Sequence, residues 1–271
     1  MHDARFRTWL LVATFSWALG FTLAAHAQAQ PEVKELTTRP GVTLRFVYLK
    51  AANPVASAVL FQGGPGNIGI FPNGSMRDGG FLAGGGQNFV QHGISVVIPD
   101  VPSDRRSLDD FRASVEHAQD NAALIDFLRQ QSPVPVWAVG TSNGSLSAAA
   151  ASTRLKDKGP DGLVLTSSVT REGRTRGLAH RVFEAPLQEV KVPVLLVHHK
   201  DDGCYVTPYD AMPALMAALS ASPRVALVTA QGGSSNGSPC QTGHHQFLGI
   251  EAAVTKDIAD WITAPRGAPM K

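Results

Sequence analysis

The stretch that decides the fold is Gly140-Thr141-Ser142-Asn143-Gly144, which matches the pattern G-x-S-x-G. An apolar, strand-like run at 134–139 precedes it, and an Ala-rich, helix-like run at 146–155 follows it. In this frame the serine can occupy a sharp turn from strand to helix, which lifts its hydroxyl clear of the sheet. The glycines suit the turn because strand and helix approach too closely there for a Cβ. Ser142 is therefore a candidate nucleophile, and the chain a candidate serine hydrolase.

A second match to the pattern occurs at Gly233-Ser234-Ser235-Asn236-Gly237. It also follows a plausible strand, at 224–229, but Ser238-Pro239-Cys240 comes directly after it in place of a helix-like run. We interpret this copy as a flexible polar loop. Only the first match has both the strand and the helix that a nucleophile turn requires.

Length and composition indicate one large globular domain. A chain of 271 residues suits a single α/β domain, and 44% hydrophobic with 17% charged residues is enough to bury a core. The formal net charge is only +2 at pH 7, and no basic patch with interleaved aromatic residues is present. Nucleic acid is therefore excluded as a partner.

The N-terminus has the features of an export signal. Arg5 and Arg7 precede an apolar run that ends in the A-x-A sequence Ala25-His26-Ala27. We expect residues 1–27 to be a cleaved signal peptide and residues 28–271 to be the mature domain, located in the periplasm or secreted. An uncleaved membrane anchor is the alternative, but polar residues interrupt the run. No second apolar span follows, so we expect no stable membrane association after cleavage.

Strand-like apolar runs alternate with helix-like stretches along the mature chain. The strand-like runs lie at 43–49, 55–61, 94–99, 134–139, 162–166, 192–198 and 224–229. Several are continuously apolar, as expected of strands buried on both faces of a parallel sheet. Helices are predicted at 107–131, 209–219 and 247–263, with Ser107 as the N-cap of the first. This alternation predicts a three-layer α/β/α sandwich.

Candidate partners for the nucleophile follow two late strands. The strand at 192–198 leads into Asp201 and Asp202, and the last strand leads into a loop with His244 and His245. In parallel sheets the active site collects at the carboxyl ends of the strands. A serine hydroxyl needs an imidazole to accept its proton and a carboxylate to orient that imidazole. The residue types fit these roles, and both adjacent pairs leave a choice open.

This order of serine, acid and histidine resembles the α/β-hydrolase superfamily, over about residues 43–262. Members have a mostly parallel, eight-stranded sheet, with the nucleophile after the fifth strand, the acid after the seventh and the histidine after the eighth. The resemblance implies the same fold for this chain. It also implies a catalytic triad of Ser142, Asp202 and His245.

Spacing within the superfamily guides the choice in each adjacent pair. The usual His-Gly-x-x-Asp spacing maps onto His198 and Asp202, although a second histidine replaces the glycine. His245 is preferred because it stands two residues before a phenylalanine that leads into the final helix, as the histidine of the superfamily does. Asp201 and His244 remain the alternatives.

A glycine-rich segment follows the strand at 55–61. Gln62-Gly63-Gly64-Pro65-Gly66 resembles the His-Gly-Gly oxyanion loop of the superfamily, which implies that the backbone N–H groups of Gly64 and Asn143 hold the oxyanion. An ordinary Gly/Pro turn is the alternative. The same segment contains a G-x-G-x-x-G match at 64–69, but Phe71-Pro72-Asn73-Gly74 prevents the helix that a dinucleotide site needs.

The chain has only two cysteines, Cys204 and Cys240. In an exported protein an isolated pair predicts a disulfide. Cys204 lies two residues beyond Asp202, and Cys240 lies five residues before His245. The bridge would therefore tie the acid loop to the base loop and limit their relative movement.

Taken together, these features predict an exported hydrolase of small-molecule carboxylic esters that acts through an acyl-enzyme intermediate, without a cofactor or a metal ion. His198 and His199 are adjacent at a strand end and should point to opposite faces, which disfavours a metal site. The short segment at 171–191 leaves no room for a large cap domain and favours accessible esters. Gly63-Gly64-Pro65-Gly66 resembles the proline iminopeptidases, so an aminopeptidase or amidase is the alternative. A catalytically silent binding protein on this fold is the second alternative.

Overall fold

The structure, a computed structural model, describes residues 28–173 and 181–264. The predicted signal peptide at 1–27 lies outside the described residues. Every helix within the described ranges is too short or too polar to cross a membrane.

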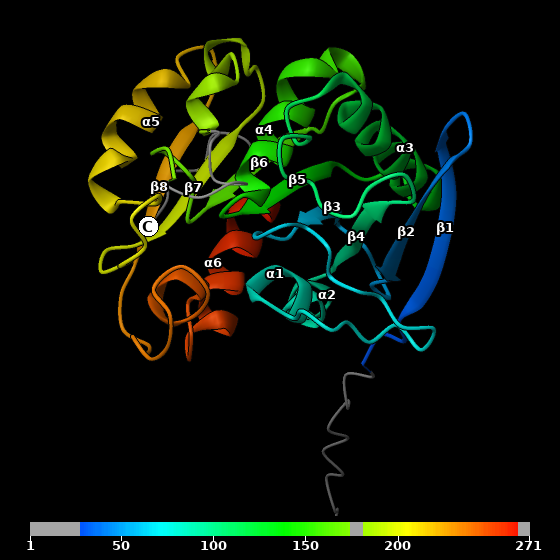
Figure 1. Cartoon of the computed structure of the whole chain (residues 1–271), viewed down its shortest axis with the longest axis horizontal. Helices are drawn as coiled ribbons and strands as arrows, with labels where there is room; N and C mark the ends of the chain where they lie inside the picture. Colours follow the sequence, from blue (N-terminus) through cyan, green and yellow to red (C-terminus); the bar gives the residue numbers. More distant parts are fainter. Residues whose placement is uncertain (1–27, 174–180, 265–271) are drawn as a thin grey trace, which may run out of the picture.

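An eight-stranded sheet forms the centre of the molecule, in the order β1-β2-β4-β3-β5-β6-β7-β8 (Figure 1). The strands are β1 (Glu32–Arg39), β2 (Val42–Leu49), β3 (Ala56–Phe61), β4 (Ile94–Pro102), β5 (Val136–Thr141), β6 (Gly162–Thr166), β7 (Val194–His199) and β8 (Val225–Ala230). The strands from β4 to β8 across the sheet pair in parallel, whereas β1 and β2 form an antiparallel edge. The mostly parallel sheet confirms the predicted fold class.

Helices cover both faces of this sheet (Figure 1). One face carries α3 (Val115–Gln131), α4 (Gly144–Arg154) and α5 (Met212–Ala218), and the other carries α1 (Phe81–Gly84), α2 (Gly86–Gln91) and α6 (Glu251–Thr263). Each face has its own hydrophobic cluster. Leu124, Ala148 and Leu215 pack in the first, while Phe89 and Ile258 pack in the second. The molecule is therefore a three-layer α/β/α sandwich.

Strand β1 was not among the predicted strands. Its sequence mixes polar and apolar residues, and its burial alternates between exposed and half-buried positions. It pairs only with β2, across a tight turn at Gly41 whose φ is +71°. An edge strand has one face in water and needs no continuous apolar run, so a search for such runs does not detect it.

Helix α3 begins later than predicted. Its N-cap is Ser114, whose side chain accepts a hydrogen bond from the backbone N–H of His117 (3.0 Å), and not Ser107. Ser107 instead exchanges hydrogen bonds with Asp109, through the Asp109 carboxylate and backbone N–H. Such local side-chain bonds compete with helix formation. The segment between the two serines is therefore a series of turns, and it carries Arg112 into the interior.

Two other sequence matches are loops, as predicted. The second G-x-S-x-G match, at 233–237, lies in an irregular loop after β8. The G-x-G-x-x-G match at 64–69 does not lead into a helix, because the next helix, α1, begins only at Phe81. Between β6 and β7 the described residues form two short 3-10 helices, at Val182–Glu184 and Leu187–Glu189.

Candidate active site

Ser142 occupies the turn between β5 and α4, in the left-handed region with φ +52°. This conformation is strained for a residue with a side chain. The turn is held by the Ser142 N–H, which donates to the Thr166 carbonyl (3.0 Å). A Cβ at Gly140 would lie 2.2 Å from the Gly144 carbonyl oxygen, and one at Gly144 would lie 1.9 Å from that of Phe61. Both glycines are therefore required by close backbone approach.

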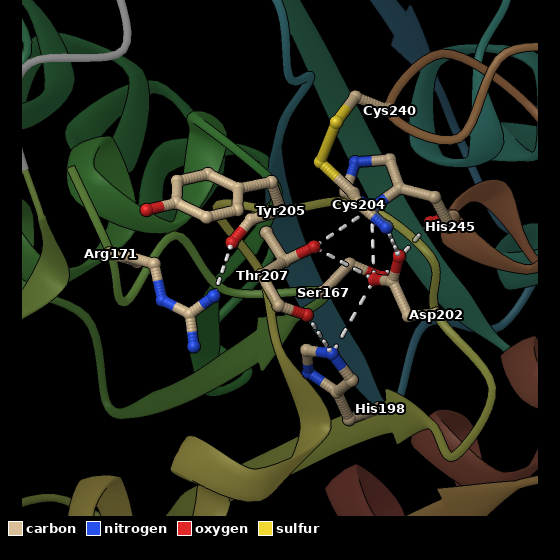
Figure 2. Close-up of a disulfide and its surroundings, with 9 residues drawn as sticks. All are labelled: Ser167, Arg171, His198, Asp202, Cys204, Tyr205, Thr207, Cys240 and His245. Carbon is tan, nitrogen blue, oxygen red and sulfur yellow. Dashed lines mark hydrogen bonds and ion pairs between the residues drawn. A yellow bond between two sulfur atoms is a disulfide. The ribbon is translucent and has the colours of Figure 1, made fainter. Parts of the chain in front are cut away.

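Asp202 lies on the loop after β7, and its side chain is fully buried. Figure 2 shows its carboxylate surrounded by hydrogen-bond donors. Oδ1 accepts from the backbone N–H of Cys204, and Oδ2 accepts from Thr207 Oγ1 and lies close to His245 Nδ1, each at 2.9 Å. The neighbouring Asp201 is exposed. Of the two candidate acids, Asp202 is the one in contact with His245.

The surroundings of Asp202 favour its ionised form. Burial by itself raises the pKa of a carboxyl group, but hydrogen bonds from His198 and His245 outweigh it. The pKa of Asp202 is consequently held well below its usual range. The carboxylate keeps its negative charge at any pH at which the protein is expected to work.

His245 is fully buried, and its ring carries the tautomer that a general base needs. A carboxylate can only accept, so the proton between His245 and Asp202 must reside on Nδ1. Nε2 then bears a lone pair, and it has no hydrogen-bond partner within the described residues. His244, in contrast, is partly exposed, stacks on His199 and donates from Nδ1 to the Asp201 carbonyl.

The turn at Ser142 and the loop that carries His245 are fastened to adjacent residues at the end of β6. The Thr166 carbonyl accepts a hydrogen bond from the Ser142 N–H, while Ser167 Oγ donates a hydrogen bond to the His245 carbonyl (2.9 Å). No hydrogen bond joins Ser142 Oγ to His245 Nε2 in this structure. Catalytic hydrogen bonds of this kind often form only once substrate is bound.

The sequence assigned no role in this network to two of its residues, although His198 marked the spacing to Asp202. Thr207 Oγ1 donates to Asp202 Oδ2 and lies 3.2 Å from His245 Nδ1, so it contacts both members of the pair. His198 Nε2 lies 3.4 Å from Asp202 Oδ2 and donates to the Thr207 carbonyl (2.8 Å). His198 lies at the end of β7, and the loop that follows brings the Asp202 carboxylate and Thr207 together beside it (Figure 2).

A cluster of His199, Asp201 and His244 lies beside this network, with potential ligand atoms within 4.8 Å of one another. The two rings stack at 4.0 Å with an interplanar angle of 11°. A metal ion binds about 2 Å from a ring nitrogen, in the plane of that ring, and two stacked planes cannot share one ion. Both nitrogens of His199 are also occupied, by the Gly232 carbonyl and the Asp201 N–H. The cluster therefore does not fit a metal ion.

The glycine-rich loop after β3 lies against the nucleophile turn. A Cβ at Gly63 would lie 2.8 Å from the Cβ of Ser142. The Gly63 carbonyl accepts the Gly66 N–H (3.3 Å), and Gly64 has a left-handed φ of +58°. No acceptor is bonded to the Gly64 N–H in the described part of the chain. The side-chain amide of Asn143 donates to the Gly64 carbonyl (3.2 Å) and joins the loop to the turn.

The predicted disulfide is formed between Cys204 and Cys240, with a Cα–Cα distance of 4.6 Å. It links the loop after β7 to the loop that precedes His245 (Figure 2). Cys204 is buried, and its backbone N–H also donates to Asp202. The bridge thus lies one hydrogen bond away from the carboxylate.

A cleft of about 410 Å³ runs between the glycine-rich loop and the base loop. Gly64 lies on one side of it, and Cys240 and Gln246 lie on the other. Most of its other side chains are polar, including Arg77 and Gln241. A group held there would meet hydrogen-bonding side chains beside apolar surface.

Comparison with known proteins adds to this description. No protein-family model matches the chain, and no curated protein matches it either. Among solved structures, it is similar to dienelactone hydrolase from Anabaena variabilis (15% identity, TM-score 0.57, covering 86% of this chain and 97% of that one). It is also similar to Est1E from Butyrivibrio proteoclasticus with bound ferulic acid (16% identity, TM-score 0.59, covering 85% of this chain and 100% of that one).

A third similar structure is the acylaminoacyl peptidase from Pyrococcus horikoshii (15% identity, TM-score 0.63), which matches 92% of this chain over 45% of its own length. All three similar proteins have the α/β-hydrolase fold. The eight-stranded, mostly parallel sheet with helices on both faces agrees with that fold. The chain therefore has the α/β-hydrolase fold.

Proposed function

We propose that this chain is a serine hydrolase that cleaves carboxylic esters. The observation that carries the proposal is the buried His245–Asp202 pair, whose only unbonded ring nitrogen is the one that must accept a proton. It is supported by the strained turn at Ser142 and by the Gly64 N–H, which has no acceptor among the described residues. These are the three components of acyl transfer: a nucleophile, an oriented base and an oxyanion donor.

In the proposed mechanism, Ser142 Oγ attacks the carbonyl carbon of the ester while His245 Nε2 takes the hydroxyl proton. Asp202 keeps the ring in the required tautomer and stabilises the imidazolium that forms. The oxyanion accepts hydrogen bonds from the backbone N–H groups of Gly64 and Asn143. His245 then protonates the leaving alcohol. Finally, it deprotonates the water that attacks the acyl carbon, and returns that proton to Ser142 Oγ as the acid leaves.

The substrate that we propose is a short ester with polar substituents. The cleft beside Gly64 offers amide and guanidinium groups that can hydrogen-bond to such substituents. The described residues between β6 and β7 form only two short 3-10 helices, which supports an accessible site. Est1E was solved with ferulic acid, a small aromatic acid with polar groups, which is compatible with this view.

We further propose that the enzyme is exported. The predicted signal peptide and the Cys204–Cys240 disulfide both support this location, since disulfides persist in oxidising compartments. Sequencing the N-terminus of the protein recovered from the periplasm or the medium tests it. A mature N-terminus at residue 28 is expected, and recovery of the full-length chain from the cytoplasm would contradict it.

Labelling with a fluorophosphonate probe tests the nucleophile. The wild-type protein should take up one equivalent of probe, and Ser142→Ala should take up none. The chain offers a matched control, Ser235→Ala, in the second G-x-S-x-G sequence, which should label like wild type. Labelling that survives in Ser142→Ala would refute the assignment, and a wild-type protein that is not labelled would indicate a binding protein.

The base is tested by His245→Ala against His244→Ala. On 4-nitrophenyl acetate the first should lower kcat by at least about 10³-fold, and the second by less than about tenfold.

A panel of nitrophenyl esters of increasing acyl length, assayed beside acylaminoacyl amides, separates an esterase from a peptidase. The similarity to acylaminoacyl peptidase makes the amides the alternative substrates, and faster cleavage of amides would replace the ester proposal.

A further inference from the structure

Arg112 is a buried cation directly behind the glycine-rich loop. Only 5% of the residue is exposed, and no carboxylate of the described chain lies within ion-pair distance of its guanidinium. It donates to three oxygens: Ser147 Oγ (2.7 Å), the Gln62 carbonyl (3.2 Å) and the Gly64 carbonyl (3.0 Å). Two of its three partners therefore belong to the loop beside Ser142.

A charge in this position is unfavourable unless its surroundings compensate for it. Burial lowers the pKa of Arg112 to about 10, so the guanidinium is still charged at neutral pH. An apolar side chain of similar length would fill the same space without this desolvation. Packing alone therefore does not account for an arginine here, whereas an arginine can supply several donors in one fixed plane.

The two loop carbonyls that Arg112 binds lie on either side of one particular peptide group. The Gln62 carbonyl belongs to the peptide before Gly63, and the Gly64 carbonyl belongs to the peptide after Gly64. Between them is the Gly63–Gly64 peptide, which carries the N–H of Gly64. Its own carbonyl points to the Gly66 N–H, and in a trans peptide the N–H points the opposite way.

We propose that Arg112 is the positioning residue of the oxyanion hole. By holding the peptide groups before and after it, Arg112 fixes the direction of the Gly64 N–H, the donor in the proposed hydrolase mechanism. Glycine has unusual backbone freedom, so a loop with glycines at 63, 64 and 66 needs such an external restraint to hold one conformation. This inference rests on the proposed function, because it assigns a role within that site.

The same guanidinium also couples the loop to the nucleophile helix. Ser147 lies on α4, the helix that begins beside Ser142, and it accepts from the third Arg112 donor. Asn143, the other proposed oxyanion donor, binds the Gly64 carbonyl from the opposite element through its side chain. Arg112 and Asn143 thus share one acceptor. The two backbone donors are consequently held in a constant relative position.

The test compares Arg112→Met and Arg112→Lys with wild type, with 4-nitrophenyl acetate as the substrate and phenylboronic acid as a tetrahedral analogue. Methionine removes every donor but keeps the length of the side chain. We expect kcat to fall by about 10- to 100-fold with KM nearly unchanged, since an oxyanion donor acts mainly in the transition state. The inhibition constant of phenylboronic acid should rise by a similar factor. Arg112→Lys keeps the charge but has fewer donors, so it should restore part of kcat and part of the affinity for phenylboronic acid.

Arg39→Met is the matched control, because Arg39 is a mostly buried arginine that is ion-paired to Asp104 and Asp120 and has no bond to the loop. It should lower the melting temperature and leave kcat and the boronic acid constant unchanged. Should Arg112→Met not fold, Ser147→Ala removes one anchor of the guanidinium and should lower kcat by about three- to tenfold.

Arg112→Met with wild-type kcat and wild-type boronic acid affinity would overturn the positioning role while leaving the hydrolase intact. A lower kcat, a higher KM and a lower melting temperature, with boronic acid binding unchanged, would also overturn the positioning role. Such a pattern would indicate general damage to the protein. A wild-type protein without turnover or probe labelling would instead refute the proposed function. The wild-type measurements thus test the proposed function, and the Arg112→Met measurements test the positioning role separately.

Discussion

His117 should make the protein sensitive to mild acid. It lies on α3 and is buried, with Nε2 at 2.9 Å from Ser147 Oγ. Burial, together with the nearby charges of Arg112 and Arg39, lowers the pKa of His117 to about 3. In the unfolded chain the same imidazole titrates near its ordinary value of about 6.5. Between these two values the unfolded state binds a proton that the folded state excludes.

The sign and size of the effect follow from this difference. Because the folded pKa is the lower one, the stabilisation is fully present above about pH 6.5 and is lost as the pH falls toward about 3. The slope is about 1.4 kcal/mol per pH unit for one proton. Between pH 7 and pH 4, His117 alone should therefore reduce the free energy of unfolding by about 3 kcal/mol.

Urea unfolding at several pH values between 7 and 4, for wild type and His117→Gln, measures this contribution. Glutamine stays neutral and can still hydrogen-bond to Ser147. The variant can be less stable than wild type at pH 7, but its loss of stability down to pH 4 should be smaller by about 3 kcal/mol. His92→Gln, at a partly exposed histidine, serves as the control and should follow wild type. Equal pH dependence in wild type and His117→Gln would refute the reasoning.

Three further predictions concern the site and its supports. Asp202→Asn should lower kcat by about 10³- to 10⁴-fold because an amide does not enforce the required His245 tautomer, whereas the exposed Asp201→Asn should retain activity in the same ester assay. The disulfide joins residues 36 positions apart in the sequence, so its reduction should lower the free energy of unfolding by about 4 kcal/mol in the chain-entropy model. An unchanged urea midpoint would show that the bridge adds no stability. Gly144→Ala should abolish soluble expression, because its Cβ would meet the backbone of Phe61 at 1.9 Å, while Gly79→Ala, with its nearest atom at 3.8 Å, should express normally.

Features encoded by contiguous residues could be predicted from the sequence. The nucleophile turn is one, because the strand, the two glycines and the helix that define it lie within about twenty residues. The buried strands are another, since each is a continuous apolar run. Edge strand β1 escaped this criterion because half of it faces water. The start of α3 was misplaced because Ser107 and Ser114 have the same capping chemistry, and local bonds of Ser107 to Asp109 decide between them.

The choice between adjacent residues depended on tertiary structure. Asp201 and Asp202 are chemically identical, and only the path of the loop after β7 turns one toward His245 and the other toward water. Thr207 joins the same network by that path.

The sequence by itself determined the fold class, the strand-to-helix turn at Ser142 and the two loops that carry the candidate acid and base. Only the tertiary structure decided which side chains of those loops meet and that Arg112 lies behind the glycine-rich loop. The physical reason is that a turn is specified by the steric demands of its own residues. A hydrogen bond between Arg112 and the carbonyl of Gly64, 48 residues away, exists only once the chain between them has folded back on itself.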